Sequence, residues 1–203
     1  MDRATFVQAG LAALVAGPSP QPAATLTGNP WNMCDKSAAL PYDHPLDLKM
    51  QVLDGPDFHL LAYRGRAVLL NIFATWCGPC NHEQPAIVDL AAQYAPQGLA
   101  VIGMNDREED DAVRTYRKKY GITYPIAMDR RGGFTRALQA GRATDISTVF
   151  PVSIFIEPHG YLYCYLTGMM SRGELDYRIK KFLDDAPPFT PSPSPSPSPT
   201  ASR

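Results

Sequence analysis

The sequence predicts an α/β domain in which helices cover a mixed β-sheet. A continuous apolar run at 67–74 is typical of a central strand covered on both faces. Residues 80–94 repeat apolar side chains at helical spacing, and a strand–turn–strand pattern at 149–166 precedes a last helix. Strands that alternate with helices and end in a hairpin indicate a mixed sheet flanked by helices.

The pattern begins with two apolar runs, 57–63 (DFHLLAY) and 67–74 (AVLLNIFA). Arg64-Gly65-Arg66 separates them, so we predict two strands joined by a tight turn. A helix is expected at 80–94, where Ile87, Leu90, Ala91 and Tyr94 recur on one face.

A short buried strand is expected at 99–104, followed by a charged helix at 106–120. That helix begins with acidic residues and ends with basic ones, an order that suits the helix dipole. Gly121 can adopt the left-handed conformation that ends a helix. The charge run therefore indicates a solvated helix rather than a binding surface.

The second half of the pattern contains shorter elements. We expect a strand at 124–128, a helix at 133–140, and strands at 149–157 and 162–166 around a turn at 158–160. Ser171 and Glu174 are spaced as a capping box, which predicts a last helix running to about Asp184.

The chain divides into four segments. Of its 203 residues 20 are proline, and the excess lies in two flanks. The expected organisation is an export signal at 1–24, an N-terminal arm at 25–45, one folded domain at 46–186 and a Pro/Ser-rich tail at 187–203. The net charge of −1 disfavours a nucleic-acid binder, and no apolar run reaches the ~18 residues of a transmembrane helix.

The two ends have different compositions. Arg3 precedes a mostly apolar stretch at 4–16 and then small residues such as Ala23 and Ala24, which favours export over a leader without a targeting role. The alternating Pro and Ser of 187–203 cannot pack a core, so the tail is an extended spacer or a disordered end without a function.

Trp76-Cys77-Gly78-Pro79-Cys80 is the motif that indicates chemistry. Two cysteines three apart at a helix start are close enough to form a disulfide. The helix N-terminus favours a thiolate, so Cys77 is expected to be the exposed nucleophile and Cys80 the resolving cysteine. Pro79 suits the first helical turn.

Two other interpretations of the motif are open. Half of a zinc site normally needs a second Cys pair, whereas Cys34 and Cys164 are isolated and His82 is poorly spaced. A structural short-range disulfide is also compatible with the spacing. The strand–motif–helix context favours redox chemistry over both.

The stretch 57–183 resembles a thioredoxin-fold domain, and 73–85 (FATWCGPCNHEQP) is similar to the TlpA/ResA group of extracytoplasmic thiol–disulfide oxidoreductases. The resemblance implies an N-terminal hairpin extension and an insertion that includes 105–145. Glu83 and Pro85 stand where that group has a glutamate and a helix-kinking proline. Glu83 would accept or return the proton of Cys80, or would be a surface residue that stabilises the helix dipole.

The resemblance also implies a cis-proline at Pro151 facing the cysteines, with the backbone of Phe150 pairing with an extended substrate segment. The bulky Phe150 departs from the usual pattern and would alter substrate choice. Trp76 would shape the substrate groove or simply pack. The expected substrate-binding residues are Trp76, Gly78, Pro79, Phe150 and Pro151.

Cys34 and Cys164 are the two cysteines outside the motif. In an exported protein an even cysteine count favours a structural disulfide between them, and in a cytosolic protein they would be buried free thiols.

The leading hypothesis is therefore an exported thiol–disulfide oxidoreductase that reduces protein disulfides. The resemblance suggests clients such as apocytochrome c or copper-site assembly proteins, with a membrane electron donor for re-reduction. No metal, small-molecule cofactor or nucleic acid is expected. The alternatives are a peroxiredoxin-like peroxidase, which the paired cysteines disfavour, and a metal-binding assembly factor, which the CxxC spacing fits poorly.

Overall fold

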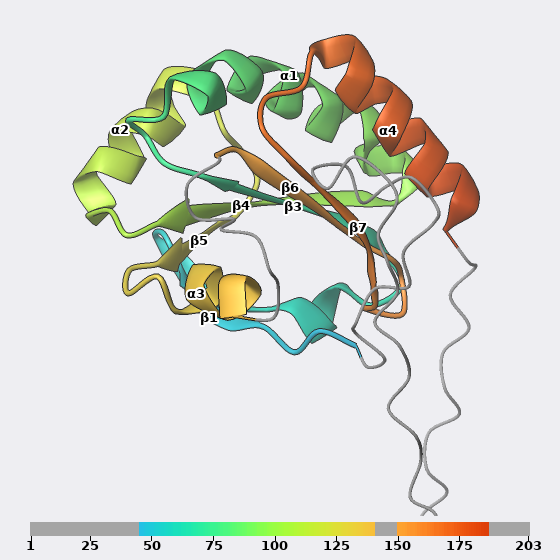
Figure 1. The fold of residues 1–203 in the computed structure, drawn as a ribbon, viewed down its shortest axis with the longest axis horizontal. Helices are drawn as coiled ribbons and strands as arrows, with labels where there is room; N and C mark the ends of the chain where they lie inside the picture. The colour runs from blue at the N-terminus through green and yellow to red at the C-terminus, as the bar shows by residue number, and fades with distance from the viewer. Residues whose placement is uncertain (1–44, 141–149, 187–203) are drawn as a thin grey trace, which may run out of the picture.

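The computed structural model describes residues 45–140 and 150–186 (Figure 1). Their sheet has seven strands in the order β2-β1-β5-β4-β3-β6-β7, which confirms the predicted mixed α/β fold. The strands are β1 (Lys49–Val52), β2 (Gly55–His59), β3 (Ala67–Phe73), β4 (Leu99–Asp106), β5 (Ile126–Asp129), β6 (Val152–Ile156) and β7 (Leu162–Thr167). The helices are α1 (Gly78–Tyr94), α2 (Asp110–Tyr120), α3 (Gly133–Ala140) and α4 (Arg172–Asp185).

Strand β3 is the centre of the sheet. All seven of its residues are buried, as the continuous apolar run predicts for a strand covered on both faces. It pairs in parallel with β4 and antiparallel with β6, so Leu70 lies between Ile102 and Ile154. This pairing places the end of β3 beside the beginning of β6.

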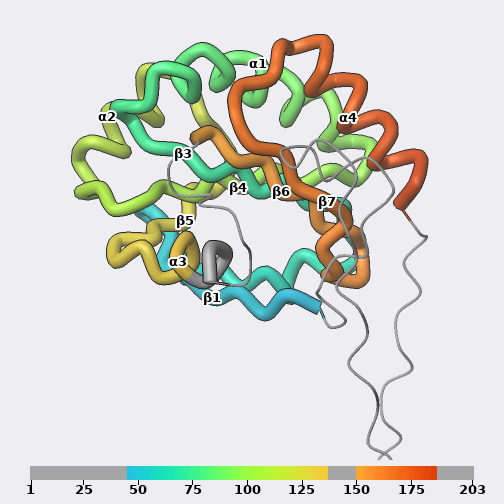
Figure 2. Tube along the Cα trace, in the orientation of Figure 1, coloured from blue at the N-terminus to red at the C-terminus, as the bar shows by residue number. Residues whose placement is uncertain are grey.

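Helices α1, α2 and α4 cover one face of the sheet and α3 lies on the other (Figure 1). The parallel order β3, β4, β5 with right-handed crossovers places α1 and α2 on the same side. Helices α1 and α4 lie side by side (Figure 2), and the Tyr94 hydroxyl donates to Asp176 at 2.7 Å. Phe182 of α4 packs edge-on against Phe155 of β6. In the part of the chain that is described, no helix has the length and apolar character needed to cross a membrane.

The first predicted strand pair is wrong in two respects. Strand β2 ends at His59 and Leu60–Tyr63 form a 3-10 helix, η1, which buries Leu60. Strand β2 pairs with β1 at the edge of the sheet, not with β3. A seven-residue apolar run fits a strand or a helical turn equally well, and here the Leu60 N–H bonds to the carbonyl of Leu48 and joins η1 to the β1 side.

The helix expected from residue 106 begins later. Asp106 ends β4, where its carboxylate accepts from the Thr135 hydroxyl at 2.9 Å and from Arg107 Nε at 2.8 Å. The helix itself starts at Asp110, and Gly121 ends it with φ 64°, the left-handed cap that the sequence predicts. A second 3-10 helix, η2 (Ala95–Gln97), follows α1.

The C-terminal part agrees with the prediction. Strands β6 and β7 pair antiparallel around the turn at 158–160, and Ser171 Oγ accepts from the Glu174 N–H at 3.2 Å to begin α4. The Glu174 carboxylate lies 3.8 Å from Arg178 rather than completing the capping box. The predicted leader, nearly all of the arm and the Pro/Ser tail lie outside the described residues.

Candidate redox site

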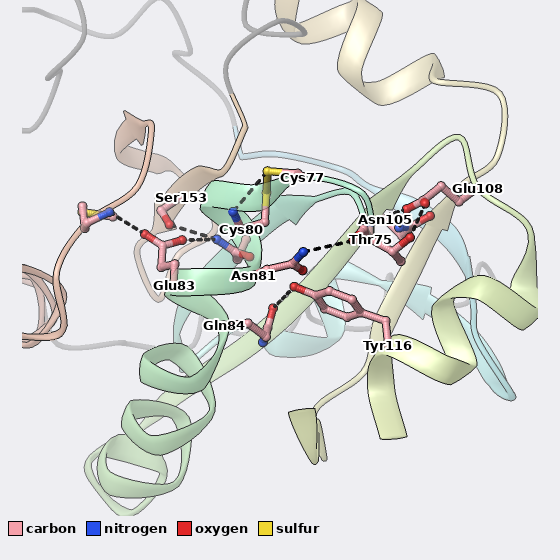
Figure 3. The surroundings of a disulfide bond; sticks show 12 residues. Thr75, Cys77, Cys80, Asn81, Glu83, Gln84, Asn105, Glu108, Tyr116 and Ser153 are labelled. Carbon is pink, nitrogen blue, oxygen red and sulfur yellow. Dashed lines mark hydrogen bonds between the residues drawn. A yellow bond between two sulfur atoms is a disulfide. The ribbon is translucent and has the colours of Figure 1, made fainter. Parts of the chain in front are cut away.

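The site begins where β3 leads into α1. The Cys77 N–H donates to the Ala74 carbonyl at 3.1 Å, so residues 74–77 form a tight turn. Cys77 is the N-cap of α1, and its Sγ accepts from the Cys80 N–H at 3.1 Å. Cys77 and Cys80 are joined by a disulfide with their Cα atoms 5.3 Å apart (Figure 3).

The two sulfurs lie at a rim of exposed side chains. Trp76 is 71% exposed, and Gly78 and Pro79 are also exposed. Cys77 is 5% exposed and Cys80 2%, so the expectation of an exposed Cys77 is not met in this disulfide form. In this form the Cys77 sulfur is bonded to the Cys80 sulfur.

Pro151 lies where the resemblance predicts, next to the motif. The Phe150–Pro151 peptide bond is cis, and the rings of Phe150 and Trp76 make an edge contact with centroids 6.2 Å apart. The Pro151 carbonyl accepts from the Gly168 N–H at 2.8 Å, which ties the β7–α4 connection to the same corner. Strand pairing thus brings the predicted substrate-binding residues of both segments together.

Glu83 is a buried carboxylate on α1, one turn after Cys80, with 1% exposure. Its Oε1 accepts from the Met170 N–H at 2.9 Å and its Oε2 from Asn71 Nδ2 at 3.4 Å. Burial raises the pKa of Glu83 from 4.5 to about 7, although the bonds from Met170 and Asn71 act to lower it. Glu83 can therefore gain or lose a proton near neutral pH, and the surface-residue interpretation is wrong.

The sequence reasoning missed Asn71 and Met170, which donate to Glu83, and Ser153, which accepts from Asn71. Asn71 donates both to Glu83 and to Ser153 Oγ, the latter at 3.2 Å. All three side chains are buried. A polar Asn71 in the middle of an apolar strand was the available signal. Met170 acts through its backbone N–H, for which a sequence carries no signal.

The remaining candidate residues are not part of this constellation. Cys164 is buried in β7, whereas Cys34 lies outside the described residues, so the predicted pairing stays a prediction. His82 is exposed on α1. Among the described residues no group of three or more His, Cys, Asp or Glu is arranged to hold a metal ion.

Comparison with known proteins agrees with this geometry. Residues 42–163 match the model of the AhpC/TSA family. The thiol-disulfide oxidoreductase ResA of Geobacillus thermodenitrificans is 30% identical over 142 residues, covering 70% of this chain and 75% of the relative. The thioredoxin-like protein YneN of Bacillus subtilis is 29% identical over 137 residues, 66% of this chain and 75% of its own length.

Solved structures show the same fold. A thiol:disulfide interchange protein of the thioredoxin family from Chlorobium tepidum superposes with a TM-score of 0.59 at 28% identity, covering 72% of this chain and 99% of that one. The chain therefore belongs to the AhpC/TSA family and is a thiol–disulfide oxidoreductase with a thioredoxin fold, related to ResA.

Proposed function

We propose that the protein is an extracytoplasmic reductase of protein disulfides in which Cys77 attacks the client and Cys80 releases it. The observation that carries this proposal is the Cys77–Cys80 disulfide at the N-terminus of α1, one helical turn from a buried carboxylate that ionises near neutral pH.

The reaction is a two-electron exchange. In the reduced protein the Cys77 thiolate attacks one sulfur of a client disulfide, forms a mixed disulfide, and expels the other client sulfur as a thiolate that takes up a proton. Cys80, deprotonated, then attacks Cys77 Sγ, which re-forms the Cys77–Cys80 disulfide and releases the second client thiolate for protonation. The client gains two electrons and two protons, and a dithiol donor restores the reduced enzyme.

The structure supports Cys77 as the nucleophile. Its Sγ accepts from the Cys80 N–H and lies at the positive end of the dipole of α1, two contacts that stabilise a thiolate. Cys80 lies deeper in the helix and is the less exposed of the two.

Glu83 is suited to move the proton of Cys80. The resolving step needs Cys80 as a thiolate, and a carboxylate with a pKa of about 7 on the same helix face is a matched base for a thiol. When the enzyme is reduced again, the protonated carboxyl returns that proton.

The client is proposed to bind at the rim formed by Trp76, Gly78 and Pro79 and at the cis-peptide corner of Phe150 and Pro151. The exposed Trp76 ring offers an apolar contact, and Phe150 contacts its edge. An extended client segment beside Pro151 would place its cysteine opposite Cys77.

The proposals for the location and the partners are based on the sequence and on the family resemblance. The predicted signal at 1–24 supports export, and an oxidising compartment requires a membrane electron donor to keep the pair reduced. Apocytochrome c and copper-site assembly proteins are the proposed clients. Fractionation of cells that express the full chain tests this location, and recovery of an unprocessed protein in the cytoplasm would contradict it.

A trapping variant tests the chemistry. Reduced Cys80→Ala protein, mixed with insulin, is expected to accumulate a mixed disulfide at Cys77, because no second thiol can resolve it. Non-reducing electrophoresis with peptide mapping measures the adduct. Cys77→Ala is the matched control and is expected to give neither an adduct nor insulin reduction. Wild-type protein that fails to reduce insulin with dithiothreitol, or an adduct that maps to Cys80, would overturn the proposed roles.

A further inference from the structure

The turn that carries Trp76 into Cys77 is held from outside by a carboxylate that the proposed chemistry does not use. Thr75 is the first central residue of this turn (Figure 3). Its N–H donates to Glu108 Oε2 at 2.7 Å and its hydroxyl to Glu108 Oε1 at 2.5 Å. Both oxygens of one carboxylate thus bind a single residue of the turn.

Glu108 is itself fixed by the sheet. Asn105 Nδ2 donates to Glu108 Oε2 at 2.6 Å, and Asn105 is fully buried at the end of β4, where it pairs with Phe73. The carboxylate is therefore anchored to the strand next to β3. Short bonds to an ionised acceptor are stronger than bonds between neutral groups.

The other side of Thr75 is held by α1. The Thr75 carbonyl accepts from Asn81 Nδ2 at 3.4 Å, and the Asn81 N–H donates to the Cys77 carbonyl at 3.1 Å. Packing contributes little at the tip of the turn, because Trp76 is 71% exposed. The hydrogen bonds of Thr75 consequently determine the position of Cys77.

We propose that Glu108 is a positioning residue for thiol–disulfide exchange. By holding Thr75 it fixes Cys77 at the N-cap of α1, where the Cys80 N–H reaches the Cys77 sulfur. Glu108 acts through Thr75 and not on the sulfurs. This inference rests on the proposed role of Cys77 as the nucleophile.

The first test measures the reactivity of Cys77 without a client. In reduced full-length protein, the rate of alkylation by iodoacetamide at Cys77 is followed against pH and assigned by mass spectrometry. Glu108→Ala is expected to raise the pH midpoint toward the ordinary thiol value of about 8.5, because Cys77 Sγ loses its fixed donor. Removal of a nearby negative charge alone would lower the midpoint, so a fall would overturn the proposal.

The second test compares variants in insulin reduction. Glu108→Ala is expected to lower kcat about tenfold or more with little change in KM, since misplaced reacting atoms slow the chemical step. Glu108→Gln keeps one acceptor for the Thr75 N–H and is expected to recover most of the rate. Thr75→Val, which keeps the backbone bond and loses the hydroxyl bond, is expected to give an intermediate rate. Equal losses in the Ala and Gln variants would indicate charge rather than position and would contradict the proposal.

Glu109→Ala is the matched control, because the neighbouring Glu109 is exposed and its side chain makes no cap bond to α2. It is expected to match the wild type in both assays. A Glu108→Ala protein with a lower melting temperature but unchanged kcat and alkylation midpoint would show a merely structural role and overturn the inference. If the wild type does not reduce insulin, the proposed function fails, while the alkylation profile still tests the position of Cys77.

Discussion

Glu83 shows at the scale of one residue how burial creates chemistry. An ionised carboxylate away from water is costly unless it is hydrogen-bonded, and among the described residues Glu83 has only the Met170 N–H and the Asn71 amide as donors. Their bonds offset part of the cost, so the pKa of Glu83 stays raised, at about 7. Because these bonds do not fully offset the cost of burial, Glu83 accepts a proton near neutral pH, and its ionised form destabilises the folded protein.

Stability should therefore fall as pH rises through the titration of Glu83. The unfolded chain loses this proton near pH 4.5 and the folded protein near 7, so the unfolded state binds fewer protons between these values. We expect Glu83 to lower the free energy of unfolding of the disulfide form by about 3 kcal/mol from pH 4 to 8. Glu83→Gln is expected to abolish this decline.

Urea unfolding at several pH values measures the effect. Glu109→Gln changes an exposed carboxylate near the same end of the sheet and should keep the decline. A Glu83→Gln protein with the same pH slope as the wild type would contradict the assignment of this proton to Glu83.

Some residues of the site could be predicted from the sequence and others could not. Cys77, Cys80 and Glu83 lie within seven positions, so one motif carries them. Asn71 is 12 positions from Glu83, Glu108 is 33 from Thr75, and Met170 is 87 from Glu83. These contacts depend on which strands become neighbours, and short-range spacing does not contain that information.

At the scale of elements, the beginning of α4 could be predicted from local sequence alone. Ser171 follows Met170 directly, and its hydroxyl accepts the Glu174 N–H that would otherwise lack a partner in the helix. The N-cap thus fixes the chain one residue after the backbone bond to Glu83.

Ser171→Ala is expected to destabilise the protein by about 1 kcal/mol, because the first turn of α4 loses its acceptor. Equilibrium urea unfolding monitored by circular dichroism measures the loss. Ser171→Asn, whose side-chain oxygen can still accept the Glu174 N–H, should cost only a few tenths of that. Equal losses in the two variants would show that the lost acceptor is not the cause.

Other elements could not be predicted from local sequence alone. Strand β1 has four residues at the edge of the sheet, alternating exposed and half-buried, too short a pattern to distinguish from a loop. The run 57–63 is mostly apolar, and its division between β2 and η1 follows from the pairing of β2 with β1. By contrast, β3 is covered on both faces, so its composition alone identifies it.

At the scale of the whole molecule, sheet order assembles the site. Strand β3 delivers Cys77 and strand β6 begins just after Pro151, and their antiparallel pairing puts the end of one beside the start of the other. The sequence pattern predicts both of these strands, and the family resemblance predicts the role of Pro151. Its contact with Trp76 through Phe150 is a product of the tertiary fold.

The Met170 hydrogen bond has a spectroscopic consequence. The donor lies in the connection between β7 and α4, and the acceptor is the ionisable group of α1. The amide chemical shift of Met170 in a ¹⁵N-labelled sample should therefore move with a midpoint near pH 7, reporting the charge of Glu83 from a different part of the chain. The shift should become independent of pH in Glu83→Gln protein, and a titration that persists there would assign the midpoint to another group. The Met170 backbone N–H would then report the protonation state of Glu83 in α1.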